Sequence, residues 1–252
     1  MAYTFFPWIR AQGALPSDPR RVTRENHERT WADMDGKIAL SSFDPQQAAL
    51  YESASWVAYY RKQWLRLARL SLELARAAFG MPIPSALYGS YLAARALMLF
   101  APDDNDVRGS EAYMRRFYSL IKRASGGNFD VALVAQLEVD WWVVHRDLSR
   151  QPDKGPLVQS LVDYYQALFG GTASSYQGAA LYRVQAMTHC DGWVRAGRTT
   201  ENPLLTLMHQ ELLTAYTLLH GALQETTLDL SRIPQTGAVS GIAGHNRVSV
   251  PG

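Results

Sequence analysis

Residues 42–82 read SFDPQQAALYESASWVAYYRKQWLRLARLSLELARAAFGMP, and this stretch decides the fold class. It opens with a helix start signal, because Asp44 can cap a helix, Pro45 suits the first helical position and Gln47 can reach back to the cap. Helical periodicity then continues until a glycine and a proline follow one another closely. The pattern predicts one long helix over 45–79, about 35 residues and roughly 50 Å long at 1.5 Å per residue.

Six further helices are predicted after this one. Apolar residues recur at helical spacing between clusters of Gly, Pro, Asn and Asp, and no segment alternates with the period of a β-strand. The chain is therefore predicted to be all-α, an irregular bundle of about seven helices with the long first helix as its spine. The second helix is apolar nearly all round, which predicts a central, buried position. The six helices are expected at 84–101, 109–124, 129–150, 156–169, 174–196 and 203–223.

The bundle is predicted to form one domain over 44–223, between two segments without helix signals. Residues 1–43 contain several prolines that prevent a continuous helix, so an irregular N-terminal arm is expected. Residues 224–252 turn to Gly, Pro, Ser and Thr, which predicts an extended C-terminal tail.

The composition excludes several classes of protein. Hydrophobic residues make up 47% of the 252 residues, enough for a substantial core, so disorder of the whole chain is excluded. A net charge of +2 gives no footprint of nucleic-acid binding. The lone cysteine, Cys190, excludes an internal disulfide and is expected to be buried and inert. No membrane span and no signal peptide are recognised, so a cytoplasmic location is expected.

Three arginines fall on helix faces that should be buried. Arg95 is the single charged residue of the predicted central helix. Arg61 and Arg183 lie among apolar residues of their own helices rather than on a solvent-facing stripe. Because an unpaired buried charge is costly, these side chains are expected to have partners inside the bundle.

Glu138 and His145 also share an apolar helix face, about 10 Å apart along the helix axis. We expect Glu138 to pair with one of the three arginines and His145 to hydrogen-bond nearby. Two interpretations stay open. In the first, Glu138 and His145 are catalytic candidates in an internal polar pocket, and Arg61, Arg95 and Arg183 bind a small anion. In the second, the same residues form an ion-pair network that fixes helix register and holds no ligand.

No motif that would name a reaction occurs in the sequence. It lacks the Glu-x-x-His pairs of a di-metal bundle site, the Gly-x-Ser-x-Gly elbow, the P-loop and the dinucleotide-binding glycine motif. The six histidines include no His-x-x-x-His pair. No metal site and no cofactor are therefore expected.

The N-terminal arm opens with a strongly apolar stretch that includes Phe5, Phe6, Trp8 and Ile9. Such a stretch is expected to pack on its own bundle or to insert into a neighbouring subunit. The low-charge tail suits a segment that becomes ordered on a partner. The sequence thus favours a non-enzymatic interaction or assembly subunit whose arms engage a protein partner or further copies of itself. The alternative is a helical-bundle enzyme or a small-ligand or metal-binding protein that uses the buried Glu/His/Arg site.

Overall fold

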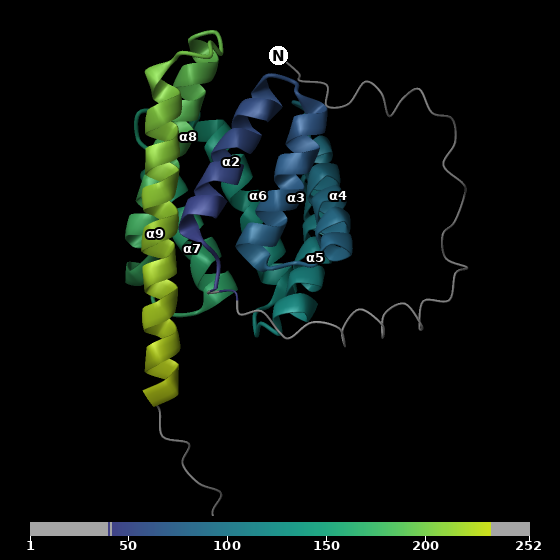
Figure 1. Ribbon diagram of the computed structural model, residues 1–252, viewed down its shortest axis with the longest axis vertical. Coiled ribbons are helices and arrows are strands. Elements are labelled where there is room, and N and C mark those ends of the chain that lie inside the picture. Colours follow the sequence, from purple (N-terminus) through teal and green to yellow (C-terminus); the bar gives the residue numbers. More distant parts are fainter. Residues whose placement is uncertain (1–39, 41, 233–252) are drawn as a thin grey trace, which may run out of the picture.

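The computed structural model describes Leu40 and residues 42–232, with side chains described as far as Glu225. All regular structure in this part of the chain is helical, which confirms the all-α prediction (Figure 1). Most of the predicted N-terminal arm, including Phe5, Phe6, Trp8 and Ile9, and the tail from residue 233 lie outside the described residues. The eight described helices are α2 (Pro45–Tyr60), α3 (Trp64–Phe79), α4 (Ile83–Phe100), α5 (Val107–Ser125), α6 (Val131–Leu148), α7 (Gly155–Phe169), α8 (Ala173–Arg195) and α9 (Pro203–Arg232).

The helix starts follow the capping signals in the sequence. The Asp44 carboxylate accepts hydrogen bonds from the backbone N–H groups of Gln46 and Gln47, and Pro45 occupies the first turn of α2. Asp106 and Asp130 cap α5 and α6 in the same way. These side chains satisfy backbone donors that have no partner within the helix, which is why the predicted starts agree with the structure to within two residues.

The predicted long helix over 45–79 is wrong, because the chain reverses between α2 and α3. Lys62 adopts a left-handed backbone with φ of 59°. The N–H of Gln63 donates to the carbonyl of Ala58 at 2.9 Å, and the N–H of Lys62 donates to that of Tyr59 at 3.0 Å. This is the Schellman arrangement that ends many helices. It normally carries glycine at the left-handed position, so a lysine there left no signal in the sequence.

The helices close into a ring. Each helix packs against the next one in the chain, and α2 also packs against α9. Figure 1 shows α8 and α9 along one side of the molecule and α3, α4 and α5 along the other, with α2 between them. Buried apolar side chains form one core among α4, α5 and α6, and further cores among α2, α7, α8 and α9. The last helix extends to Arg232, past the end predicted at residue 223.

Helix α4 is one member of the ring, with an exposed side, and is not the central, buried helix that was predicted. It contacts α3 on one side and α5 on the other. Its buried face is built mostly from small residues, with Ala86, Gly89 and Ala96 all buried. A β-carbon at Gly89 would lie 3.3 Å from the Phe117 ring of α5, so the glycine permits this close approach. An all-round apolar pattern therefore results here from one buried face and one exposed apolar face.

The left-handed residue between α2 and α3 gives a first prediction. A left-handed backbone costs a residue with a β-carbon about 1 kcal/mol, whereas glycine adopts it without strain. Because glycine also adds freedom to the unfolded chain, Lys62→Gly should raise the free energy of unfolding by a net amount of roughly 0.5 kcal/mol. Lys62→Ala, which keeps the β-carbon, should change it little. Urea unfolding followed by circular dichroism measures both, and a Gly variant less stable than the Ala variant would contradict the assigned turn.

Candidate functional site

The centre of the ring holds a buried ion pair between Glu52 of α2 and Arg183 of α8. The guanidinium donates to both carboxylate oxygens, at 3.0 Å and 2.6 Å, and the Tyr216 hydroxyl of α9 donates to the same carboxylate at 2.6 Å. The side chains of Glu52 and Arg183 are 8% and 15% exposed. Burial alone would lower the pKa of Arg183, but the Glu52 carboxylate and neighbouring tyrosines hold it well above its usual value. This bidentate pair joins three helices at one point.

Glu138 of α6 lies in a second polar group and does not form the expected direct pair with an arginine. The Tyr118 hydroxyl of α5 donates to one of its oxygens at 2.9 Å, and the Trp142 indole N–H donates to the other at 3.1 Å. The hydroxyls of Tyr118 and Tyr164 are 2.7 Å apart. Since Tyr118 has one proton and donates it to Glu138, its oxygen accepts from Tyr164 of α7. The carboxyl thus receives hydrogen bonds from one neighbouring helix, α5, and from its own helix, and Tyr164 of α7 joins the group through Tyr118.

The interior raises the pKa values of this second group. Burial is the main cause of the raised pKa of the Glu138 carboxyl, and the hydrogen bond from Tyr118 and the charge of Arg183 offset it only in part. Burial, followed by the charge of Glu138, also raises the pKa of Tyr118 and of Tyr164 well above the usual range. The tyrosine hydroxyls therefore stay protonated and serve as donors, and Glu138 is the group here whose charge can change with pH.

The two groups influence each other through Arg183. Its charge lowers the pKa of Glu138, although the hydrogen bonds of its guanidinium go to Glu52. The guanidinium also lies 5.9 Å from the centre of the Trp141 ring and 6.0 Å from that of Tyr216, within range of cation–π attraction. Side chains from α2, α5, α6, α7, α8 and α9 meet in this one interior region. The arrangement corresponds to the network interpretation, with Glu52 as the direct partner of the cation.

The other predicted site residues lie apart from this region. His145 has its Nε2 3.4 Å from an Asp191 carboxylate oxygen of α8, and no hydrogen bond joins it to Glu138. Arg61 donates to the carbonyl of Arg198 at 3.1 Å and lies over the Trp193 ring, so it ties the α2–α3 turn to the α8–α9 turn. These contacts connect elements of the fold that are distant in the sequence.

Arg95 points to the α4–α5 side of the bundle. Its guanidinium lies 5.5 Å from the centre of the Tyr113 ring of α5, and Arg116 lies 6.0 Å from the centre of the same ring. The Nε of Arg95 has no hydrogen-bond partner. Neither arginine forms an ion pair with a carboxylate of the described residues. The three predicted ligand-binding arginines are therefore in three separate places.

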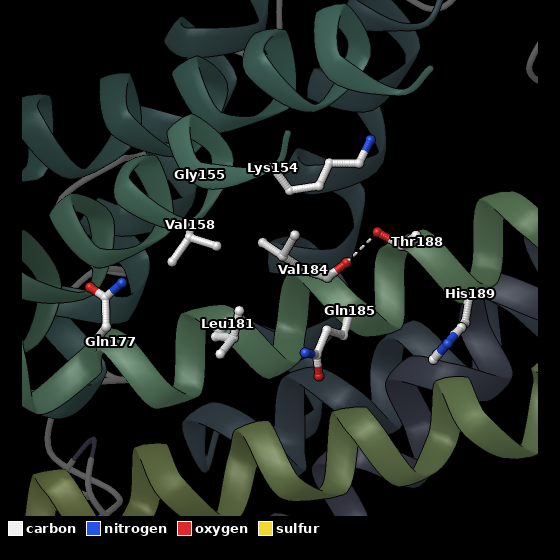
Figure 2. A pocket seen from close by; sticks show the side chains of 9 residues that line it. All are labelled: Lys154, Gly155, Val158, Gln177, Leu181, Val184, Gln185, Thr188 and His189. Atoms are coloured by element: carbon white, nitrogen blue, oxygen red, sulfur yellow. Dashed lines mark hydrogen bonds between the residues drawn. The ribbon is translucent and has the colours of Figure 1, made fainter. Parts of the chain in front are cut away.

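A surface hollow of about 430 Å³ lies between α7 and α8, away from the buried network (Figure 2). The Lys154 amine at its rim donates to the carbonyl of Leu148, and the Thr188 hydroxyl donates to that of Val184. None of the sequence-predicted site residues lines it. The lining residues are Lys154, Gly155, Val158, Gln177, Leu181, Val184, Gln185, Thr188 and His189.

The described part of the chain offers neither a metal centre nor a membrane-spanning helix. No group of three or more His, Cys, Asp or Glu side chains there is placed to hold a metal ion. Among the helices from α2 to α9, none combines the length and apolar character needed to cross a bilayer. Cys190 is buried, as expected, and burial followed by the charge of Asp191 raises the pKa of its thiol.

The feature that sequence reasoning missed is an exposed apolar face on α4. Several bulky side chains of this helix are exposed, while its buried face combines the small residues Ala86, Gly89 and Ala96 with Leu92 and Phe100. The rings of Tyr88 and Tyr91 stack on this surface, with centroids 6.4 Å apart. We call the five exposed residues the α4 face: Ile83 (51% exposed), Leu87 (55%), Tyr88 (48%), Tyr91 (53%) and Leu97 (41%). Comparisons with protein families, curated proteins and solved structures found no match.

The central ion pair predicts a strongly coupled pair of substitutions. Arg183→Met leaves the Glu52 carboxylate buried without its cation, so we expect the free energy of unfolding to fall by about 3 to 5 kcal/mol. Adding Glu52→Gln removes the stranded charge and should recover roughly half of that loss. Chemical denaturation of the two single variants and the double variant measures the coupling energy. Additive losses would show that the two side chains act independently.

The raised pKa of Glu138 predicts how stability depends on pH. A carboxyl with a raised folded-state pKa binds its proton more tightly in the folded chain, so its contribution to stability falls as pH rises through the interval above the ordinary glutamate pKa. Glu138→Gln cannot ionise and should become more stable relative to the wild type between pH 4 and pH 7. The gain is about 1.4 kcal/mol for each unit by which burial raises the pKa. A constant difference across this range would contradict the assignment.

Proposed function

We propose that this chain is a non-enzymatic interaction or assembly subunit that docks a protein partner on the α4 face. The observation that carries the proposal is the exposure of five bulky apolar side chains on one helix. Exposed hydrophobic residues scattered singly need no explanation, whereas contiguous exposed apolar patches are typical of interaction sites, and here five such residues share one helix. Tyrosine in particular is enriched at such sites, because its ring is apolar and its hydroxyl tolerates water.

Burial of this face would supply substantial binding free energy. Full burial of a large apolar side chain contributes about 1.5 to 3 kcal/mol, so covering the exposed half of each of the five gives roughly 1 kcal/mol apiece. The helix backbone behind the face is held by tight packing of Ala86, Gly89 and Ala96 against its neighbours. The face is therefore presented on a rigid support, which reduces the entropy lost on binding.

The alternative, an enzyme or ligand-binding protein with a buried Glu/His/Arg site, has less support. Glu138 and Arg183 are each engaged by side chains of the bundle, and the hollow between α7 and α8 contains neither. The proposal also includes the terminal segments that the sequence predicts to engage neighbouring chains. A cytoplasmic location remains a prediction from the sequence.

Substitution on the α4 face tests the proposal. Leu87→Asp places a charge at the middle of the face on a side chain that is already 55% exposed, so the fold should be kept while partner binding is lost. Leu207→Asp on α9, at a site 40% exposed on the opposite side of the ring, is the matched control. Affinity capture from the native cell extract, quantified by mass spectrometry for wild type and both variants, measures the effect. The proposal requires a partner retained by Leu207→Asp and lost by Leu87→Asp. Equal capture by all three proteins would refute it.

A further inference from the structure

We infer that the partner on the α4 face is an acidic amphipathic helix of another protein. This inference rests on the proposed docking function and adds the chemistry of the occupant. An amphipathic helix packs on another helix by fitting its apolar side chains, at spacings of three and four residues, between those of the other helix. The charges around the α4 face then decide which kind of helix fits.

The part of the chain that surrounds the α4 face is the most basic part of the bundle. Residues 64–125, from α3 to α5, contain nine basic and five acidic residues, whereas the whole chain has 25 and 23. The two helices that contact α4 both expose arginines to solvent. These are Arg66, Arg69 and Arg76 on α3 and Arg108, Arg115, Arg116 and Arg123 on α5.

The α5 side of the face has two arginines that lack carboxylate partners. Arg95 follows Tyr91 by one helical turn, so it borders the apolar face on α4. Arg95 and Arg116 both lie over the Tyr113 ring, at 5.5 Å and 6.0 Å from its centre. Neither forms an ion pair with a described carboxylate, in contrast to Arg115, which pairs with Glu111. Two cations beside one ring repel each other, and a carboxylate from a partner would relieve this repulsion.

Charge complementarity disfavours occupants from this chain itself. A second copy would bring the same arginines to the interface, so like charges would face each other. The sequence 1–39 contains six basic and five acidic residues, and 233–252 contains one basic and no acidic residue. Neither terminal segment has an excess of acidic residues that would complement the arginines around the α4 face. The occupant that fits is therefore a different protein.

An anionic membrane surface fits less well than an acidic helix. The connection that follows α4 carries exposed Asp103, Asp104 and Asp106, which an anionic bilayer would repel. The apolar residues also follow one helix rather than a broad plane, and a single helical ridge suits a partner helix. Binding to an anionic membrane is one of the outcomes that the test below distinguishes.

The test uses the full chain and two fluorescent helical peptides whose apolar faces are identical in sequence. One peptide has Leu and Ile at the a and d positions with Glu at the e and g positions, and the other has Lys in place of Glu. We expect the wild type to bind the Glu peptide more tightly by fluorescence anisotropy. Arg116→Glu should weaken that binding roughly fivefold to tenfold and improve binding of the Lys peptide. Arg95→Gln should also weaken binding of the Glu peptide. Arg195→Glu, at an exposed position of α8 away from α4, is the control for net charge.

The outcomes separate this inference from the proposed function. If Leu87→Asp abolishes binding while the two peptides bind equally and Arg116→Glu has no effect, the face docks a partner but the acidic chemistry is wrong. If neither peptide binds, the inference is overturned. Binding to phosphatidylserine vesicles without peptide binding would replace it with a lipid surface. Self-association in analytical ultracentrifugation that Leu87→Asp removes would replace it with a second copy of the chain.

Discussion

The buried pair of Glu52 and Arg183 is the interaction on which the closed ring depends. A ring of helices packed in chain order would open where its first and last members meet, unless something joins them. Arg183 of α8 binds Glu52 of α2, and Tyr216 of α9 donates to the same carboxylate. Both charges are nearly removed from water, so any packing that separates them leaves an unpaired buried charge. The pair therefore selects one arrangement of these three helices over others of similar hydrophobic content.

The same physics explains why the buried polar residues are hydrogen-bonded to one another. A buried carboxyl is tolerated only if its oxygens receive hydrogen bonds or its charge is removed. Both conditions apply to Glu138: Tyr118 and Trp142 donate hydrogen bonds to its carboxyl oxygens, and burial raises the pKa of the carboxyl, which favours its uncharged form. Tyr164 completes the group by donating to Tyr118. With its hydrogen-bonding capacity used inside the bundle, this group stabilises helix register.

Sequence patterns predicted the helices well because helix signals are local. They did not predict which side chains pair with one another, because such pairs form between helices that are distant in the sequence. The cap at Asp44 and the turn clusters depend on neighbouring residues, so most helix bounds could be read directly. Glu52 could have been recognised as the pairing anion, because it is the single charged residue of residues 45–60. The hydroxyl partners Tyr118 and Tyr164 gave no signal, since a tyrosine on an apolar face is typical of any core. Which arginine meets which carboxylate depends on how distant helices pack, and periodicity does not contain that information.

Helix α4 shows how an apolar pattern can mislead and still be informative. Burying large side chains and exposing small ones is the favourable choice for a helix that packs on one side only, because stabilisation grows with the apolar area removed from water. Helix α4 follows this in part, since Leu92 and Phe100 are buried, but it also has Ala86 and Gly89 inside and Leu87 and Tyr91 outside. The close contact that Gly89 permits with Phe117 recovers part of the packing energy. The large residues outside contribute little to folding of the chain itself, and the proposed docking of a partner would bury them.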